Sequence, residues 1–179
     1  MLSLLLLLFA FCSKNEEIET DNSDNNTTNT EDTISFDGKE VLIAYFSRAN
    51  YVPEGTDGVS GATNKAGNTQ TVAYYIGQQI GGDIFEIIPE RNYPVSHSAC
   101  SAIAQQEVKD NARPALVSHV EDMEKYSIIF VGFPIWVYRE PMAVLTFLEE
   151  YDFKGKTVIP FCTSMAVGME RSVDGIRNP

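Results

Sequence analysis

The sequence is poor in the residues that most disulfide, metal and nucleic-acid sites require. Its 179 residues include three cysteines and two histidines, and no Cys-x-x-Cys or His-x-x-x-His spacing occurs. These features exclude a disulfide scaffold and provide no zinc motif. Thirteen Lys and Arg residues stand against twenty-five Asp and Glu, which gives a formal net charge of -12. Because clustered cations bind nucleic-acid backbones, this balance argues against a nucleic-acid partner.

Long apolar runs are also absent, and one short run lies at the N-terminus. Leu2 to Phe11 is apolar apart from Ser3. A membrane-spanning helix needs roughly twenty such residues, so this length is typical of the hydrophobic region of a signal peptide. Residues 1–12 resemble a bacterial lipoprotein signal ending in a lipidated Cys12, although Phe11 stands where a small residue is usual and no cation precedes the run. The prediction is a lipid-anchored protein of the bacterial cell envelope, periplasmic or surface-facing; a cleaved ordinary signal is the alternative.

An acidic, polar segment follows the cysteine. Residues 13–35 hold seven acidic residues and one Lys, so they carry -6 of the net charge. Such a segment buries too little apolar surface to order itself. We therefore expect a disordered tether at 13–35 and one domain at 36–179, a normal length for a single core.

Strand-like and helix-like segments alternate through that domain. Short apolar runs at 41–47, 83–88, 127–133 and 157–163 predict strands, because strands buried on both faces are apolar throughout. Helical spacing predicts helices at 68–80, 98–111 and 141–150, and a further helix begins near Met169. This order indicates the α/β class, with a doubly wound parallel sheet covered by helices on both faces.

The loop after the first strand has the composition of an anion site. It runs from Arg48 to Ala66 with many Gly, Ser, Thr and Asn residues, and ends in Gly67-Asn68-Thr69 at a predicted helix start. Amide donors and the helix dipole together favour an anion there. Neither the P-loop nor the dinucleotide fingerprint is present. Hydroxyls and amides without Lys suit a phosphate monoester held by neutral donors.

The loop after the third strand holds the single Trp of the chain. It reads Pro134-Ile135-Trp136-Val137-Tyr138. Trp136 and Tyr138 are candidates to stack on a flat ring, since aromatic side chains combine large apolar faces with polar edges. The alternative is that both cap the edge of the sheet.

Together these motifs resemble the flavodoxin family, whose members bind flavin mononucleotide (FMN). The motifs are YFS at 45–47, GNT at 67–69, FPIWVYREPMAV at 133–144 and TFLEEYDFKGKTVIPFCT at 146–163. The resemblance spans about residues 41–176. It implies the flavodoxin-like strand order 2-1-3-4, with the family's fifth strand missing from this C-terminally incomplete domain.

The resemblance also implies which residues hold FMN, and it supplies no catalytic residue and no metal ligand. Ser47, Asn68 and Thr69 would hold the phosphate, and Gly67 would permit its close approach. Trp136 and Tyr138 would flank the isoalloxazine, and the loop 164–168 would cover its other edge. The full set expected to bind FMN is Ser47, Arg48, Gly67, Asn68, Thr69, Pro134, Trp136, Tyr138, Thr163, Ser164 and Gly168.

Similar proteins often have Trp-Trp-Gly where this chain has Trp136-Val137-Tyr138. The resemblance implies an electron-transfer protein that carries non-covalent FMN and docks a redox partner. Two alternatives stay open: an NAD(P)H-dependent FMN reductase of a quinone or other small molecule, and a remnant that no longer binds flavin. The sequence does not decide whether the protein is an enzyme.

Overall fold

The computed structural model describes residues 36, 40–48, 66–94, 96–165 and 168–177. The expected signal segment with its lipidation site Cys12 and the expected tether at 13–35 lie outside these residues. So does most of the polar loop that precedes Gly67. Within the described part of the chain, no helix is long and apolar enough to cross a membrane.

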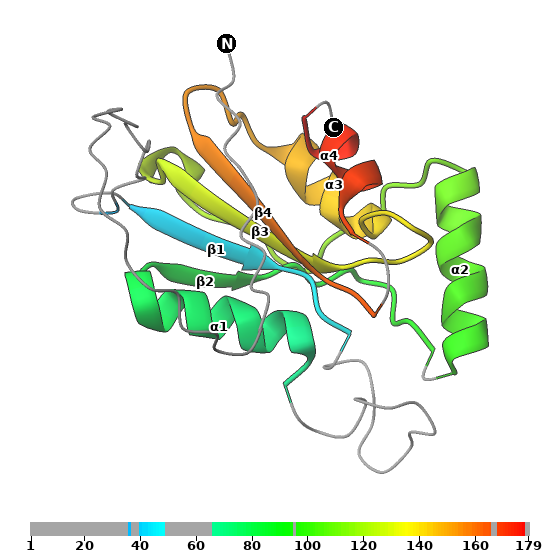
Figure 1. Cartoon of the computed structure of the whole chain (residues 1–179). Helices are drawn as coiled ribbons and strands as arrows, with labels where there is room; N and C mark the ends of the chain where they lie inside the picture. Colours follow the sequence, from blue (N-terminus) through cyan, green and yellow to red (C-terminus); the bar gives the residue numbers. More distant parts are fainter. Residues whose placement is uncertain (1–35, 37–39, 49–65, 95, 166–167, 178–179) are drawn as a thin grey trace, which may run out of the picture.

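A parallel sheet forms the centre of the domain (Figure 1). Its described strands are β1 (Val41–Tyr45), β2 (Asp83–Glu86), β3 (Ile128–Pro134) and β4 (Thr157–Thr163). They lie in the order β2-β1-β3-β4, and every pairing is parallel. This confirms the predicted α/β class and the order 2-1-3-4. Strands β1 and β2 each end two residues before the predicted limit, and their last residues, Tyr45 and Glu86, pair in register.

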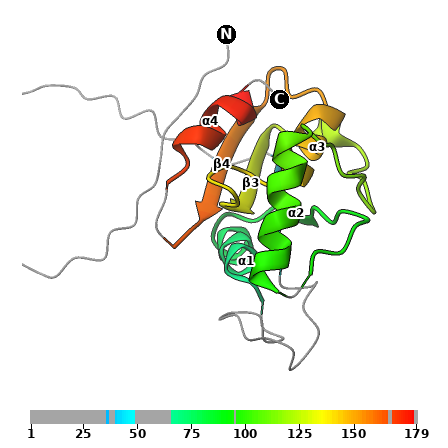
Figure 2. The ribbon, with the colours of Figure 1, turned by 90° about the vertical axis from the view of Figure 1, so that its right-hand side faces the viewer.

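Helices cover both faces of the sheet (Figures 1 and 2). Helix α1 (Asn68–Ile80) packs on one face, and α2 (His97–Lys109), α3 (Met142–Glu150) and α4 (Glu170–Arg177) belong to the other. A short 3-10 helix, η2 (Met123–Lys125), precedes β3. The helices therefore begin and end close to the positions that hydrophobic spacing predicts.

Strand β1 shows why the sheet needs cover on both sides. Its side chains alternate: Leu42 and Ala44 join the cluster with α2 and α3, whereas Val41, Ile43 and Tyr45 join the cluster with α1. None of these side chains is more than 4% exposed. A strand that is apolar on both faces must be covered by two layers, which gives the three-layer arrangement.

Gly132 in the middle of the sheet allows a ring from the neighbouring strand to lie across it. In the register of the sheet, Gly132 pairs with Tyr45 on one side and with Phe161 on the other. A Cβ atom at Gly132 would lie 2.0 Å from Cζ of Phe161. A Cβ atom at that distance would force the Phe161 ring to move, so glycine at this position allows the ring to pack across the strand.

We expect Gly132→Ala to lower the free energy of unfolding by about 1–3 kcal/mol, the cost typical of an overpacked core. Urea unfolding followed by circular dichroism measures it. In a Phe161→Ala background the same substitution should cost less, because the ring that blocks the Cβ is gone. An equal cost in both backgrounds would contradict the packing explanation.

Candidate functional site

The carboxyl ends of the strands bring hydroxyl groups together at one edge of the sheet. Thr69 lies in the first turn of α1 and Thr163 ends β4, and their Oγ1 atoms are 2.7 Å apart. Ser47, just past the end of β1, is buried like Thr69; each is 2% exposed. Two residues 94 positions apart in the chain thus meet between the loop predicted to bind the phosphate and the loop predicted to cover the isoalloxazine.

The start of α1 adds backbone donors to this edge. Its N-cap is Gly67, which has no side chain to accept from the first-turn amides. The Gly67 carbonyl accepts from the amide of Thr71 at 2.8 Å, so the helix begins directly at Asn68. Amides left without a helical partner and the positive end of the helix dipole both favour an anion.

A tight turn carries the two predicted ring-stacking residues. The Trp136 amide donates to the Arg139 carbonyl at 2.8 Å, and the Arg139 amide donates back to the Trp136 carbonyl at 3.0 Å. The two residues between them have positive φ, 50° at Val137 and 64° at Tyr138. These angles are typical of a type I′ turn, which glycine and asparagine occupy more readily than β-branched or aromatic residues.

The turn sends Trp136 and Tyr138 to different surroundings. The Trp136 indole is partly buried and meets the rings of Phe46 and Tyr93 edge-on, with centroids 5.1 and 4.9 Å away. Tyr138 is 63% exposed, and the Arg171 guanidinium of α4 lies 5.5 Å from its ring centre. Trp136 is therefore anchored in the core, whereas Tyr138 lies at the surface.

Two buried glutamates, Glu107 and Glu140, bind residues around this turn. Their burial was not predicted from the sequence. The Tyr93 hydroxyl donates to the Glu107 carboxylate, at 3.0 and 3.2 Å from its two oxygens. Glu140, which is fully buried, accepts from Arg139 Nε at 3.1 Å. The sequence could have indicated burial of Glu107, because this residue shares a helical face with the buried Cys100 and Ala104.

Glycine in α4 lets that helix approach the buried Glu140. A Cβ atom at Gly175 would lie 2.5 Å from Oε1 of Glu140 and 3.2 Å from Nη2 of Arg139. The Arg139–Glu140 ion pair at the end of the tight turn therefore also limits how closely α4 can pack. Nothing in the sequence pattern around residues 139 and 140 distinguishes them from exposed charges.

The other predicted site residues lie around the same edge. Arg48 turns toward the loop after β2, where its Nη2 donates to the Pro94 carbonyl at 3.1 Å. Pro134 ends β3 and pairs in register with Thr163. Ser164 is exposed and Gly168 is partly buried. Residues 166–167 of the loop expected to cover the isoalloxazine lie outside the described residues.

Comparison with known proteins assigns the family. A family model described as flavodoxin matches residues 40–179. The chain belongs to the flavodoxin family. No curated protein matches the chain significantly.

Solved flavoproteins share the flavodoxin fold of this chain. A predicted flavoprotein from Bacteroides eggerthii is 29% identical with a TM-score of 0.61, and the match covers 78% of this chain and 79% of that one. Its counterpart from Bacteroides uniformis gives the same identity and TM-score over 78% and 81% of the two chains. A flavoprotein from Lactobacillus acidophilus, solved in complex with FMN, is 22% identical with a TM-score of 0.60 over 78% and 84%. At that lower identity the likeness shows the fold alone.

The tight turn has Val137 and Tyr138 where the resemblance led us to expect Trp and Gly. Tyr138 holds the left-handed conformation, which costs an L-residue about 1–2 kcal/mol and glycine almost nothing. We expect Tyr138→Gly to be more stable than Tyr138→Ala by roughly 0.5–1 kcal/mol. Both variants remove the ring and its contact with Arg171, so their difference in urea unfolding isolates the backbone effect. Equal stabilities would show that the turn relaxes without strain.

Burial raises the pKa of the Glu107 carboxyl above its ordinary value of 4.5, and the Tyr93 hydrogen bond and Arg91 only partly oppose this. The folded state therefore holds this proton more tightly than the unfolded state. The associated stability is present below about pH 4.5 and is lost as pH rises through the folded pKa. We expect Glu107→Gln, whose amide oxygen still accepts from Tyr93, to gain stability relative to the native chain as pH rises from about 4 to about 7.5.

Urea unfolding at several pH values measures this difference. Glu121→Gln, at an exposed position, is the matched control and should follow the native chain closely. A difference between Glu107→Gln and the native chain that does not grow with pH would contradict the expectation.

Proposed function

We propose that this flavodoxin-family chain binds FMN non-covalently and acts as an electron-transfer protein. The observation that carries the proposal is the 2.7 Å contact between Thr69 and Thr163, which joins a hydroxyl of the uncapped first turn of α1 to one at the end of β4. When bound, FMN supplies the redox chemistry, and the protein supplies binding, orientation and electrostatics. The Lactobacillus acidophilus relative is solved with FMN, which supports the choice of cofactor.

The residues at this edge fit a phosphate monoester. Ser47, Thr69 and Thr163 offer hydroxyl donors, and the first-turn amides at Asn68 and Thr69 offer N–H groups at a positive helix end. Burial of Ser47 and Thr69 excludes water from their hydroxyls, which strengthens a hydrogen bond to a charged oxygen. Trp136 and Tyr138 lie in the turn that follows β3, where they would border the flavin ring.

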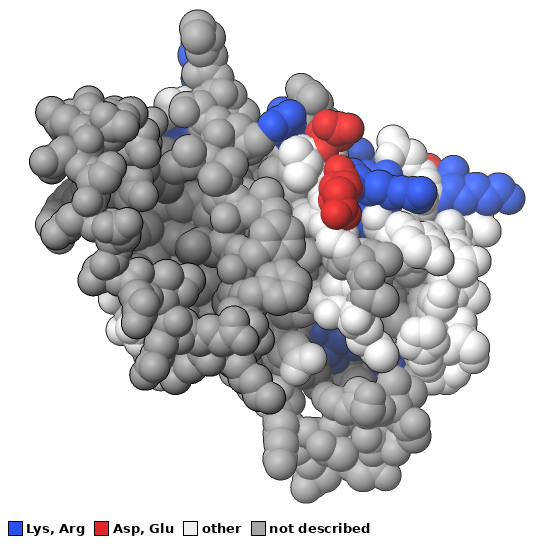
Figure 3. Space-filling model, in the orientation of Figure 1, with Lys and Arg blue, Asp and Glu red and all other residues white. Residues whose placement is uncertain are grey.

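Charge supports a basic redox partner. The full chain carries -12, and electrostatic complementarity speeds the docking of oppositely charged proteins. In Figure 3, the acidic side chains seen on the face of Figure 1 lie near α4 with basic ones beside them, and further basic side chains lie apart from these, so the described basic residues form no continuous surface in this view. We further propose that Cys12 anchors the chain to the cell envelope, on the basis of the apolar run that precedes it.

Titration of the full chain with FMN, followed by flavin fluorescence and visible absorption, tests the proposal. We expect saturable binding, and we expect Thr69→Val to weaken it roughly tenfold or more, because the valine removes one hydrogen bond to a charged group at constant shape. Riboflavin, which lacks the phosphate, should bind much more weakly than FMN.

Thr146→Val is the matched control. Thr146 lies on α3 and its hydroxyl donates to the Met142 carbonyl within that helix, so the variant should bind FMN like the native chain. A folded native chain that leaves the flavin spectrum unchanged would overturn FMN binding. Equal affinities of FMN and riboflavin would overturn the assignment of the phosphate to this edge.

A further inference from the structure

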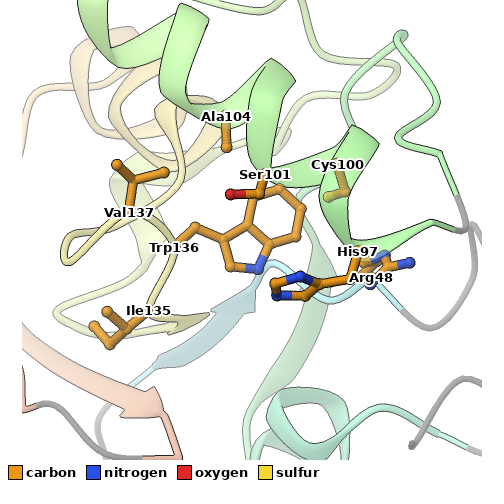
Figure 4. Close-up of a pocket in the computed structure, with 8 residues that line it drawn as sticks. All are labelled: Arg48, His97, Cys100, Ser101, Ala104, Ile135, Trp136 and Val137. Carbon is orange, nitrogen blue, oxygen red and sulfur yellow. The ribbon is translucent and has the colours of Figure 1, made fainter. Parts of the chain in front are cut away.

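A pocket of about 120 Å³ lies between α2 and the turn that follows β3 (Figure 4). Arg48, His97 and Trp136 are among the residues that line it. Because Arg48 and Trp136 also belong to the set expected to bind FMN, this pocket adjoins the expected flavin edge. Helix α1 presents a different kind of surface, on the opposite face of the sheet from α2 (Figures 1 and 2).

Helix α1 carries no charge, although the chain is strongly acidic. Its 13 residues include no Asp, Glu, Lys, Arg or His. Each of the other described α-helices has charged side chains: α3 ends in two acids, and α2 and α4 hold both acids and bases. The surface of a globular domain normally mixes charges of both signs, and net charge keeps copies apart. The exposed side of α1 lacks this protection.

The two sides of α1 have different surroundings. Its inner side packs in the cluster with β1 and β3 through Ala73, Ile76 and Ile80. The residues on the opposite side of the helix are exposed and uncharged. They are Thr71, Tyr75, Gln78 and Gln79, and we call them the outer face of α1.

Tyr75 lies at the centre of this outer face and is 61% exposed. It makes no hydrogen bond or ring contact within the described part of the chain. The other described tyrosines each have such a contact, which are the ring pair Tyr45–Tyr74, the Arg171 guanidinium over Tyr138, and the hydrogen bonds of Tyr93, Tyr126 and Tyr151. Protein interfaces are enriched in tyrosine, and charged residues are depleted at their centres. The outer face of α1 therefore has the composition of an interface.

The charge of the chain points to a second copy as the partner. The whole chain carries -12, so two copies repel each other wherever both present acids. A basic partner gains nothing from a neutral face and docks more favourably on acidic side chains. A second acidic copy, by contrast, can approach closely only where neither surface is charged. The outer face of α1 meets that condition.

The position of Tyr75 suits a contact that repeats itself about a two-fold axis. The helix runs from Asn68 to Ile80, so Tyr75 is one residue past its midpoint. In an antiparallel pair with Tyr75 on the axis, the two helices overlap over almost their whole length, about 20 Å. Thr71 then faces Gln79 of the other copy, and this hydroxyl–amide pair occurs twice.

We propose that two copies of this chain form a weak antiparallel dimer through the outer faces of α1, with Tyr75 against Tyr75 at the two-fold axis. One helix from each copy buries less than the roughly 800 Å² per partner of a standard interface, so dimerisation depends on concentration. The dimer does not rest on FMN binding. Because the expected phosphate edge is at the start of α1, the antiparallel pair places the two edges at opposite ends.

Sedimentation equilibrium of the full chain over a wide range of concentrations tests the proposal. We expect a monomer–dimer equilibrium that shifts toward the dimer as sodium chloride is raised, because salt screens the repulsion between two acidic chains. Tyr75→Glu should weaken dimerisation at least about tenfold, because it places two like charges together at the axis. Gln105→Glu adds the same charge at an exposed position of α2, and this matched control should dimerise like the native chain.

A pair of charges tests the antiparallel arrangement. Thr71→Lys combined with Gln79→Glu leaves the net charge unchanged and sets opposite charges against each other twice in the antiparallel pair. This double variant should dimerise at least about twofold more tightly than the native chain. In a parallel pair it would set like charges against each other and dimerise more weakly, which would overturn the arrangement proposed.

Three other results would overturn the dimer. The first is a monomer at every concentration and salt. The second is association that is unchanged in Tyr75→Glu, which would assign it to another surface, such as the apolar run at residues 2–11. The third is association that weakens with salt, which would indicate paired charges. Each substituted side chain is exposed, so the circular dichroism spectra should match that of the native chain. Tyr75→Glu should bind FMN like the native chain, so failure of the FMN proposal is seen separately.

Discussion

Burial of β1 between its two neighbours is the constraint on which the rest of the structure depends. The strand is covered on both faces and paired along both edges, so its apolar side chains are satisfied only if a helix lies on each side of the sheet. Parallel pairing then sets every strand to end at the same edge. Ser47, Trp136 and Thr163 meet there because of backbone geometry, although they are widely spaced in the chain.

Close approaches of backbone and side chains refine that arrangement. Gly132 makes room for the Phe161 ring within the sheet, and Gly175 makes room for the buried Glu140 under α4. A methyl group at either position would push apart elements that border the site. The geometry of the site edge therefore also depends on packing at glycines that are outside the set expected to bind FMN.

Buried polar pairs then hold Tyr93 and the tight turn in place. The Tyr93 hydroxyl is tied to Glu107 on α2, and the Tyr93 ring meets Trp136 edge-on. Arg139 closes the tight turn and pairs with Glu140. Burying either carboxylate alone would cost free energy, and its hydrogen-bonded partner offsets part of that cost. The same contacts that stabilise the turn hold the indole in place after the end of β3.

Apolar runs and helical spacing in the sequence predicted the strands, the helices and the loops that contain the site, because they report which faces must be buried. The resemblance to the flavodoxin family implied the strand order. It also placed Thr69, Thr163 and Trp136 at the same edge of the sheet, where the strands have their carboxyl ends. Only the tertiary structure decided that Glu107 and Glu140 are buried, that Val137 and Tyr138 adopt positive φ, and that Arg48 joins His97 in one pocket. Local sequence patterns cannot encode these features, since each depends on side chains brought together from elements far apart in the chain.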